Sequence, residues 1–189
     1  MVIHQPITNY AKSISTTYHQ KASLSKRITI ASLLGALAAI LQSAGGFIPI
    51  VGLLISPFAT LPIIFSTILS IRYGFLSYLL TIFLLLLIQP SELIIFPFTT
   101  GLLGLAIGYA FHFCKRRINL IITGSLSLLS GILIVLFLFR FPLLGPSLST
   151  INLPLLILLI IFCFLYSWLW VKISGFLLKR LSFFFINSF

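Results

Sequence analysis

Acidic residues are almost absent from this sequence. Asp and Glu together contribute one residue of 189, Glu92, whereas Lys and Arg contribute twelve. Intramembrane aspartyl hydrolases need two carboxylates that share a proton, and metal-dependent phosphotransferases need several acidic ligands for their cation. One carboxylate therefore excludes both classes. Because the chain also lacks a Walker-type glycine loop and an identifiable nucleophile with its base, we expect no enzymatic activity and no cofactor.

Charged residues of either sign make up only 7% of the chain, and 60% of its residues are hydrophobic. A soluble domain of this size needs a charged shell, which twelve basic residues and one acid do not supply. The mean hydropathy of +1.23 predicts an integral membrane protein instead. The basic residues lie at the ends of apolar runs, so membrane lipids with anionic headgroups, and not nucleic acid, are the expected partner of the positive charge.

Cysteine is also scarce. Cys114 and Cys163 lie in separate apolar runs and match no metal-binding or redox spacing. His112 and Cys114 are two residues apart, a spacing that points side chains away from each other on a helix. We therefore expect the cysteines and His112 to be structural, and we expect no metal site.

Long apolar runs, in contrast, are frequent. A bilayer core about 30 Å thick needs roughly 20 apolar residues per helix. Six runs meet this requirement, at residues 28–44, 50–71, 73–88, 93–113, 118–139 and 154–171. Pro57 and Pro62 interrupt the second run, so five helices with a re-entrant segment at 47–55 are the alternative.

The basic residues test this topology independently. Eleven of the twelve lie before the first run, between the second and third, between the fourth and fifth, or after the sixth: Lys12, Lys21, Lys26, Arg27, Arg72, Lys115, Arg116, Arg117, Lys172, Lys179 and Arg180. Cytoplasmic loops are enriched in Lys and Arg, and five helices would break this distribution. The predicted fold is an all-α bundle of six transmembrane helices with both termini in the cytoplasm.

The chain divides into three parts on this basis. Residues 1–25 are a polar cytoplasmic leader, either loosely held or folded as a short interfacial helix, and residues 26–172 are the transmembrane domain. Residues 173–189 are a tail that continues the sixth helix or lies along the inner leaflet. Tyr166, Trp168 and Trp170 precede this tail and are interpreted as aromatic residues of the headgroup zone.

The one acid lies on the predicted outer face. Glu92 opens the fourth helix, and Phe96 and Thr99 follow at i+4 and i+7, on the same helical face. Arg140, on the longest outer loop, is the one basic residue predicted outside. An isolated acid with an aromatic and a hydroxyl neighbour suits a small polar or cationic ligand.

Two further features bear on this interpretation. Pro97 should bend the fourth helix and loosen a backbone carbonyl. The alternative to a ligand site is that Glu92 is a helix-start carboxylate with Ser91 as its cap, and that Arg140 is merely interfacial.

Small residues form stripes on two of the predicted helices. Ala31, Gly35 and Ala39 are spaced four apart on the first helix, and the fourth helix has a similar series of glycines, Gly101, Gly104 and Gly108. Such stripes let helices approach closely in lipid. One stripe is expected to pack inside the bundle while that of the first helix contacts a different subunit; the alternative is internal packing for both.

These features resemble the substrate-binding (S) subunits of energy-coupling-factor (ECF) vitamin transporters. Those are small six-helix proteins with both termini inside, an Ala-x-x-x-Ala-type stripe on the first helix and a ligand site under the first, third and fifth loops. The resemblance implies transport, namely capture of a vitamin or similar micronutrient in a bacterial plasma membrane, with release through a membrane coupling subunit and two ATPases. It also implies a set of ligand contacts: Gln42, Glu92, Thr99, Arg140 and Asn152.

Two other functions are weighed against this one. A scaffold similar to the rod-shape-determining membrane proteins of the cell-wall machinery is also a small polytopic bundle, and its stripe would bind a morphogenetic partner. A lipid-metabolism enzyme is disfavoured by the single carboxylate.

Overall fold

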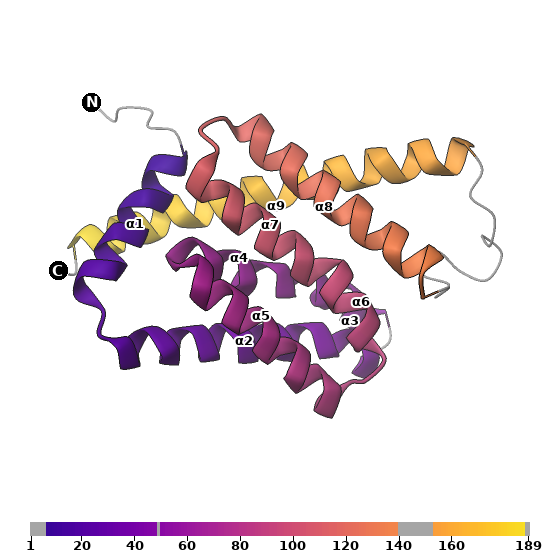
Figure 1. Ribbon diagram of the computed structural model, residues 1–189, viewed down its shortest axis with the longest axis horizontal. Helices are drawn as coiled ribbons and strands as arrows, with labels where there is room; N and C mark the ends of the chain where they lie inside the picture. The colour runs from indigo at the N-terminus through magenta and orange to yellow at the C-terminus, as the bar shows by residue number, and fades with distance from the viewer. Residues whose placement is uncertain (1–6, 49, 140–152, 188–189) are drawn as a thin grey trace.

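The computed structural model describes residues 7–48, 50–139 and 153–187, and every element within these ranges is helical (Figure 1). The elements are, in chain order, α1 (Ile7–Lys21), α2 (Leu24–Phe47), α3 (Val51–Ile55), the 3₁₀-helix η1 (Ser56–Ala59), α4 (Thr60–Leu69), α5 (Ile71–Ile88), α6 (Glu92–Phe98), α7 (Thr100–Phe113), α8 (Arg117–Phe137) and α9 (Leu153–Asn187).

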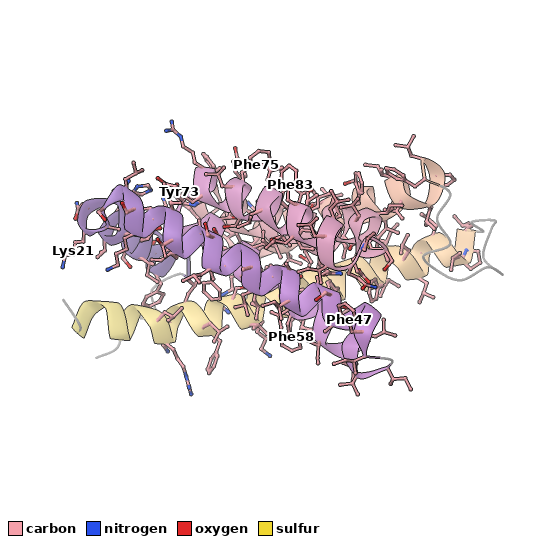
Figure 2. All side chains as sticks on the ribbon, turned by 90° about the horizontal axis from the view of Figure 1, so that it is seen from below. Lys21, Phe47, Phe58, Tyr73, Phe75 and Phe83 are labelled. Atoms are coloured by element: carbon pink, nitrogen blue, oxygen red, sulfur yellow. The ribbon has the colours of Figure 1, made fainter. Side chains whose placement is uncertain are left out.

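Six spans are long and apolar enough to cross a membrane: Leu24–Phe47, Val51–Leu69, Ile71–Ile88, Glu92–Phe113, Arg117–Phe137 and Leu153–Leu181. This confirms the prediction of an all-helical chain with six such spans. Large apolar side chains cover the outside of the bundle. Phe75 and Phe83 of α5, for example, point outward in Figure 2 and are 52% and 62% exposed. A bilayer would cover this surface more favourably than water does.

Successive spans run back and forth between two ends of the bundle (Figure 1). We call one end the α1 end, because α1 packs there against α4, α7 and α9. The opposite end, where α2 stops at Phe47, α5 stops at Ile88 and α6 starts, is the Glu92 end. Lys26, Arg72 and Arg117 lie in the first turns of α2, α5 and α8, which all start at the α1 end. Positive charge therefore gathers away from Glu92.

The second span is a succession of three short helices. Val51–Leu69 comprises α3, η1 and α4, and Pro57 lies in the 3₁₀ turn between the two α-helices. Proline is tolerated near the start of a helical segment because its missing N–H has no intrahelical partner there. The chain thus continues along one span through the segment for which the re-entrant alternative was considered.

The fourth span is interrupted at Thr99, two residues after Pro97. Thr99 has φ −117° and ψ −94°, outside the helical region, and separates α6 from α7. Neighbouring helices accommodate the carbonyls at the break. The Tyr78 hydroxyl donates to Pro97 O at 3.1 Å, and Phe98 O lies so close to Gly131 of α8 that a Cβ added there would be 1.6 Å away.

The small-residue stripe of α2 packs α2 against α5. Ala31, Gly35 and Ala39 are all buried. The Ser77 hydroxyl donates to Ala31 O at 2.7 Å, and a Cβ on Gly35 would lie 2.9 Å from Ser77 O. This position corrects the expectation that the stripe contacts another subunit. Its small residues are used inside the chain, because they let α5 hydroxyls reach α2 carbonyls.

The glycine stripe of α7 is internal as well. Cβ atoms added to Gly104 and Gly108 would lie 2.9 Å from Ile63 Cβ and 2.5 Å from Thr67 Cβ, both on α4. Close packing of α7 on α4 therefore depends on these glycines. The alternative of internal packing describes both stripes.

The polar leader contains a docked helix. Thr8, Ala11, Ile14, Ser15 and Tyr18 form the buried face of α1, at the spacing of an amphipathic helix. The Ser15 hydroxyl donates to the carbonyl at the end of α4, Leu69 O, at 3.2 Å. Of the two possibilities for the leader, the structure has a helix, and it rests on the bundle.

Arg27 ties the end of α1 to the start of α2. Its guanidinium donates to Ala22 O at 2.9 Å and also to His19 O, and the Tyr18 hydroxyl donates to Arg27 O at 3.3 Å. Burial raises the pKa of the Tyr18 hydroxyl above its ordinary value, and the nearby Tyr73 raises it further by a smaller amount. The opposite terminus continues the last span, since α9 runs without interruption to Asn187.

Candidate functional site

A chain of two hydrogen bonds links three helices at the Glu92 end. The Thr100 hydroxyl donates to Gln42 Oε1 at 2.8 Å, and Gln42 Nε2 donates to Glu92 Oε2 at 2.8 Å. Gln42 is 2% exposed and Thr100 is 9% exposed, whereas Glu92 is half-buried. The two bonds therefore lead from a buried hydroxyl to a carboxylate that solvent still reaches.

Local structure explains why these three side chains meet. Gln42 lies on the face of α2 that also carries the fully buried Ala38 and Ala39. Glu92 is the first residue of α6, and Thr100 is the first residue of α7, directly after the break. Both are thus at helix starts.

The hydrogen-bonding chemistry gives the chain a direction. An ionised carboxylate only accepts, so the Gln42 amide must present its NH₂ group to Glu92. The Gln42 carbonyl then faces Thr100, whose hydroxyl can donate. The Glu92 carboxylate is held in one orientation by a partner that is itself held.

The second oxygen of Glu92 faces α2 at Gly45. A Cβ added to Gly45 would lie 3.6 Å from Glu92 Oε1 and 3.4 Å from the Ser56 hydroxyl oxygen. Oε1 accepts no hydrogen bond from any residue that the structure describes. The carboxylate oxygen and the hydroxyl therefore approach one small patch of backbone, where a cation or a donor group would find two oxygens.

Gln89 completes the polar surroundings. Its Nε2 donates to the Ser91 hydroxyl at 2.9 Å, and a Cβ added to Gly46 would collide with the Gln89 side chain at 1.9 Å. Ser91 makes no side-chain capping bond to α6. Ser91 thus holds the N-cap position that the helix-start alternative gives it, but its hydroxyl does not cap the helix. We refer to the following six residues as the Glu92 cluster: Gln42, Ser56, Gln89, Ser91, Glu92 and Thr100.

The structure brings together only part of the predicted site. Gln42 and Glu92 are in direct contact. Phe96 is fully buried and its ring stacks on Tyr78 with centroids 5.8 Å apart, so it belongs to the packing of the bundle. Thr99 is buried too, and its hydroxyl donates to the Ile95 carbonyl, four residues earlier in the same span, at 2.7 Å. Arg140 and Asn152 lie outside the described residues.

Thr100 is the residue that sequence reasoning missed. Thr99 and Thr100 follow Glu92 at i+7 and i+8, two positions that lie near the same face of a regular helix. The break at Thr99 selects between them, and it gives the contact with Gln42 to Thr100. The signal available in the sequence was the interrupting Pro97.

His112 and the two tryptophans lie outside the Glu92 cluster. His112 Nε2 forms a hydrogen bond of 2.9 Å with Thr67 O, and no group of three potential metal ligands occurs in the part of the chain that the structure describes. Trp168 is exposed, with the Lys172 ammonium 4.8 Å from its ring centre, and its interpretation as a headgroup-zone residue stays a prediction. Trp170, however, is only 2% exposed, which corrects its interpretation as a headgroup-zone residue.

The six long apolar helices and the composition are consistent with a multi-pass membrane protein, and a polar cluster lies at one end of the bundle. No protein-family model, curated protein or solved structure matches this chain. The Glu92 cluster is accordingly interpreted from its own geometry.

Proposed function

We propose that this protein is the substrate-capture subunit of an ECF-type importer in a bacterial plasma membrane. Its ligand would be a vitamin or related micronutrient with a cationic or donor group that binds at the Glu92 cluster. The observation that carries this proposal is the directed chain from Thr100 through Gln42 to Glu92. These two hydrogen bonds orient the carboxylate of Glu92, which is the only acidic side chain in a protein of net charge +11.

The electrostatics of the cluster support a cationic group. A carboxylate that is partly removed from water loses solvation, and one amide hydrogen bond offsets only part of that loss. Glu92 Oε1 and the Ser56 hydroxyl are close to the same point at Gly45. An ammonium group placed there would gain both a charge partner and a second acceptor.

The distribution of basic residues supports the proposed orientation. They gather at the α1 end, in first turns such as those of Lys26, Arg72 and Arg117. Because positive residues favour the cytoplasmic side, this distribution supports an orientation with both termini inside and the Glu92 cluster outside. A ligand would then arrive from the exterior.

Inward release would require partners. One carboxylate does not support ATP hydrolysis, so a membrane coupling subunit and ATPases would supply the energy. Because Ala31, Gly35 and Ala39 are buried against α5, such a subunit would contact another face of the bundle.

Ligand binding by the purified protein tests this function. Native mass spectrometry should detect a co-purifying small molecule, and one candidate micronutrient should raise Tm. Glu92→Gln should weaken its binding at least roughly tenfold, or about 1.4 kcal/mol. Ser13→Ala is the control and should keep the parent's affinity, because Ser13 is exposed on α1 at the opposite end of the bundle and its hydroxyl bonds Tyr10 O.

If no molecule co-purifies and no candidate raises Tm, the proposal fails and the scaffold function becomes the better one. If a ligand is found but the Glu92→Gln variant binds it with the parent's affinity, the Glu92 cluster is not the binding site.

A further inference from the structure

Two buried polar atoms in the interior lack hydrogen-bond partners among the described residues. They are the hydroxyl oxygen of Thr60 and the indole nitrogen of Trp170. Thr60 is 0% exposed and Trp170 is 2% exposed, so bulk water does not reach either residue. Buried polar groups in folded proteins are nearly always hydrogen-bonded, since an unpaired one loses its hydration without compensation. A pair of such atoms requires an explanation.

The two atoms belong to elements that pack together. Thr60 is the first residue of α4 and Trp170 lies on α9, which contacts α4. One turn earlier on α9, the Tyr166 ring meets the Trp170 ring edge-on, with centroids 5.9 Å apart. The Tyr166 hydroxyl lies within hydrogen-bonding reach of both Thr60 and Trp170. Neither contact, however, has the geometry of a completed hydrogen bond to the two orphaned atoms.

Aromatic rings surround this point. The ring of Phe58, on η1, lies edge-on to Trp170 at 5.5 Å with an interplanar angle of 86°. Phe58 is 47% exposed, and Figure 2 shows it on the outside of the bundle. Two hydroxyls and one indole N–H thus converge behind an aromatic residue that faces the surroundings of the bundle.

The types of group indicate what they can bind. An indole N–H only donates, whereas the hydroxyls of Thr60 and Tyr166 donate and accept. None of the three carries a charge at neutral pH. The complementary group is a neutral oxygen with lone pairs for the indole, such as water or the hydroxyl or carbonyl oxygen of a bound molecule.

We infer that Thr60, Tyr166 and Trp170 form a buried binding site for one neutral oxygen atom. This site involves α4 and α9, whereas the Glu92 cluster belongs to α2, η1 and the α5–α7 region. The inference therefore stands whether or not the proposed function is correct.

Thermal stability provides the first test. If the Thr60 hydroxyl bonds a bound oxygen, Thr60→Val should lower Tm by about 2–4 °C, because that oxygen loses a partner. Thr81→Val is the reference, since Thr81 is equally buried and its hydroxyl reaches Gly35 O at 2.9 Å. If Thr60→Val is as stable as the parent or more so while Thr81→Val is destabilised, the hydroxyl is unpartnered and the inference is overturned.

Spectroscopy of Trp170 tests the site without depending on stability. The chain has two tryptophans, so Trp168→Phe leaves Trp170 as the only indole. Its N–H-sensitive band in ultraviolet resonance Raman spectra should be that of a hydrogen-bonded indole. It should shift toward the unbonded position when Thr60→Val or Tyr166→Phe is added. An unbonded band in the Trp168→Phe protein would assign the N–H to the face of an aromatic neighbour and overturn the inference.

The source of the oxygen is then identified by mass. Native mass spectrometry of the same protein after exhaustive detergent exchange supports a bound molecule if an additional mass persists. It supports water if no additional mass remains and both Thr60→Val and Tyr166→Phe shift a hydrogen-bonded Raman band. If only Tyr166→Phe shifts the band, the Tyr166 hydroxyl is itself the partner of the indole and the inference is overturned. Glu92→Gln should leave the band unchanged, which separates this test from that of the proposed function.

Discussion

The Gln42 side-chain amide and the Glu92 carboxylate are joined by a hydrogen bond of 2.8 Å between the end of α2 and the start of α6. The two residues are 50 positions apart in the sequence. Their contact turns an isolated acid into part of a directed network that includes Thr100. It also makes Gln42 the central residue of the Glu92 cluster.

Replacement of Gln42 should destabilise the protein. Gln42→Leu leaves the buried Thr100 hydroxyl and the Glu92 carboxylate without their amide partner, and we expect a loss of about 1–3 kcal/mol in unfolding free energy. Thermal unfolding in detergent measures it. In a double-mutant cycle, the loss should be smaller when Glu92→Gln is already present. Additive effects would show that the two side chains are not coupled.

Enlargement of Gly35 should prevent folding. A Cβ at this position would already lie 2.9 Å from Ser77 O, so Gly35→Trp must separate α2 from α5. Size-exclusion chromatography should show little monodisperse protein. Leu33→Trp, at a site on α2 that is 65% exposed, is the matched control and should fold normally. A well-folded Gly35→Trp protein that loses only a partner subunit would restore the original expectation of a partner surface.

A single methyl group at Gly131 should also be costly. The Phe98 carbonyl, displaced at the helix break, would be 1.6 Å from the new Cβ, so α6 and α8 must move apart. We expect Gly131→Ala to lose about 1–3 kcal/mol, in line with overpacking of a well-packed interior. Thermal unfolding is compared with that of Ser130→Ala, an exposed neighbour on the same helix. Equal Tm values for the two variants would mean that α8 does not approach the break so closely.

The docking of α1 should weaken at high pH. Burial raises the pKa of Tyr18 above 10.0, so the folded state favours the neutral hydroxyl. This contribution to stability is fully present below pH 10 and is lost as the pH rises through the raised pKa. Tm measured from pH 8 to 11 should therefore fall more steeply for the parent than for Tyr18→Phe. Tyr10→Phe, on the same helix, should retain the parent's dependence; identical slopes for all three proteins would contradict the role of Tyr18.

Composition and local pattern were enough to predict the six spans. Apolar runs of sufficient length can be recognised without tertiary information, because a span of about 30 Å needs roughly 20 apolar residues. The weak points were visible too. Pro57 and Pro97 mark the second and fourth spans, in which the structure has a 3₁₀ turn and a helix break.

The candidate site was predictable only in part. The scarcity of acid singled out Glu92, whereas Gln42 was expected as a ligand contact only from the resemblance to the S subunits. Nothing local distinguished Thr100 from Thr99, because both are near the same helical face. That choice depends on the backbone conformation at Thr99, which neighbours such as Tyr78 and Gly131 stabilise from other helices.

The sequence by itself determined the six apolar helical spans, since each run of apolar residues is long enough to cross a bilayer. Only the tertiary structure decided what each helical face packs against. A stripe of small residues packs equally well against a neighbour within the chain or a partner, and the α5 hydroxyls of Ser77 and Thr81 made the internal choice for α2. Likewise, Trp168 and Trp170 differ by two positions, yet the packing of α9 leaves one exposed and buries the other beside Thr60.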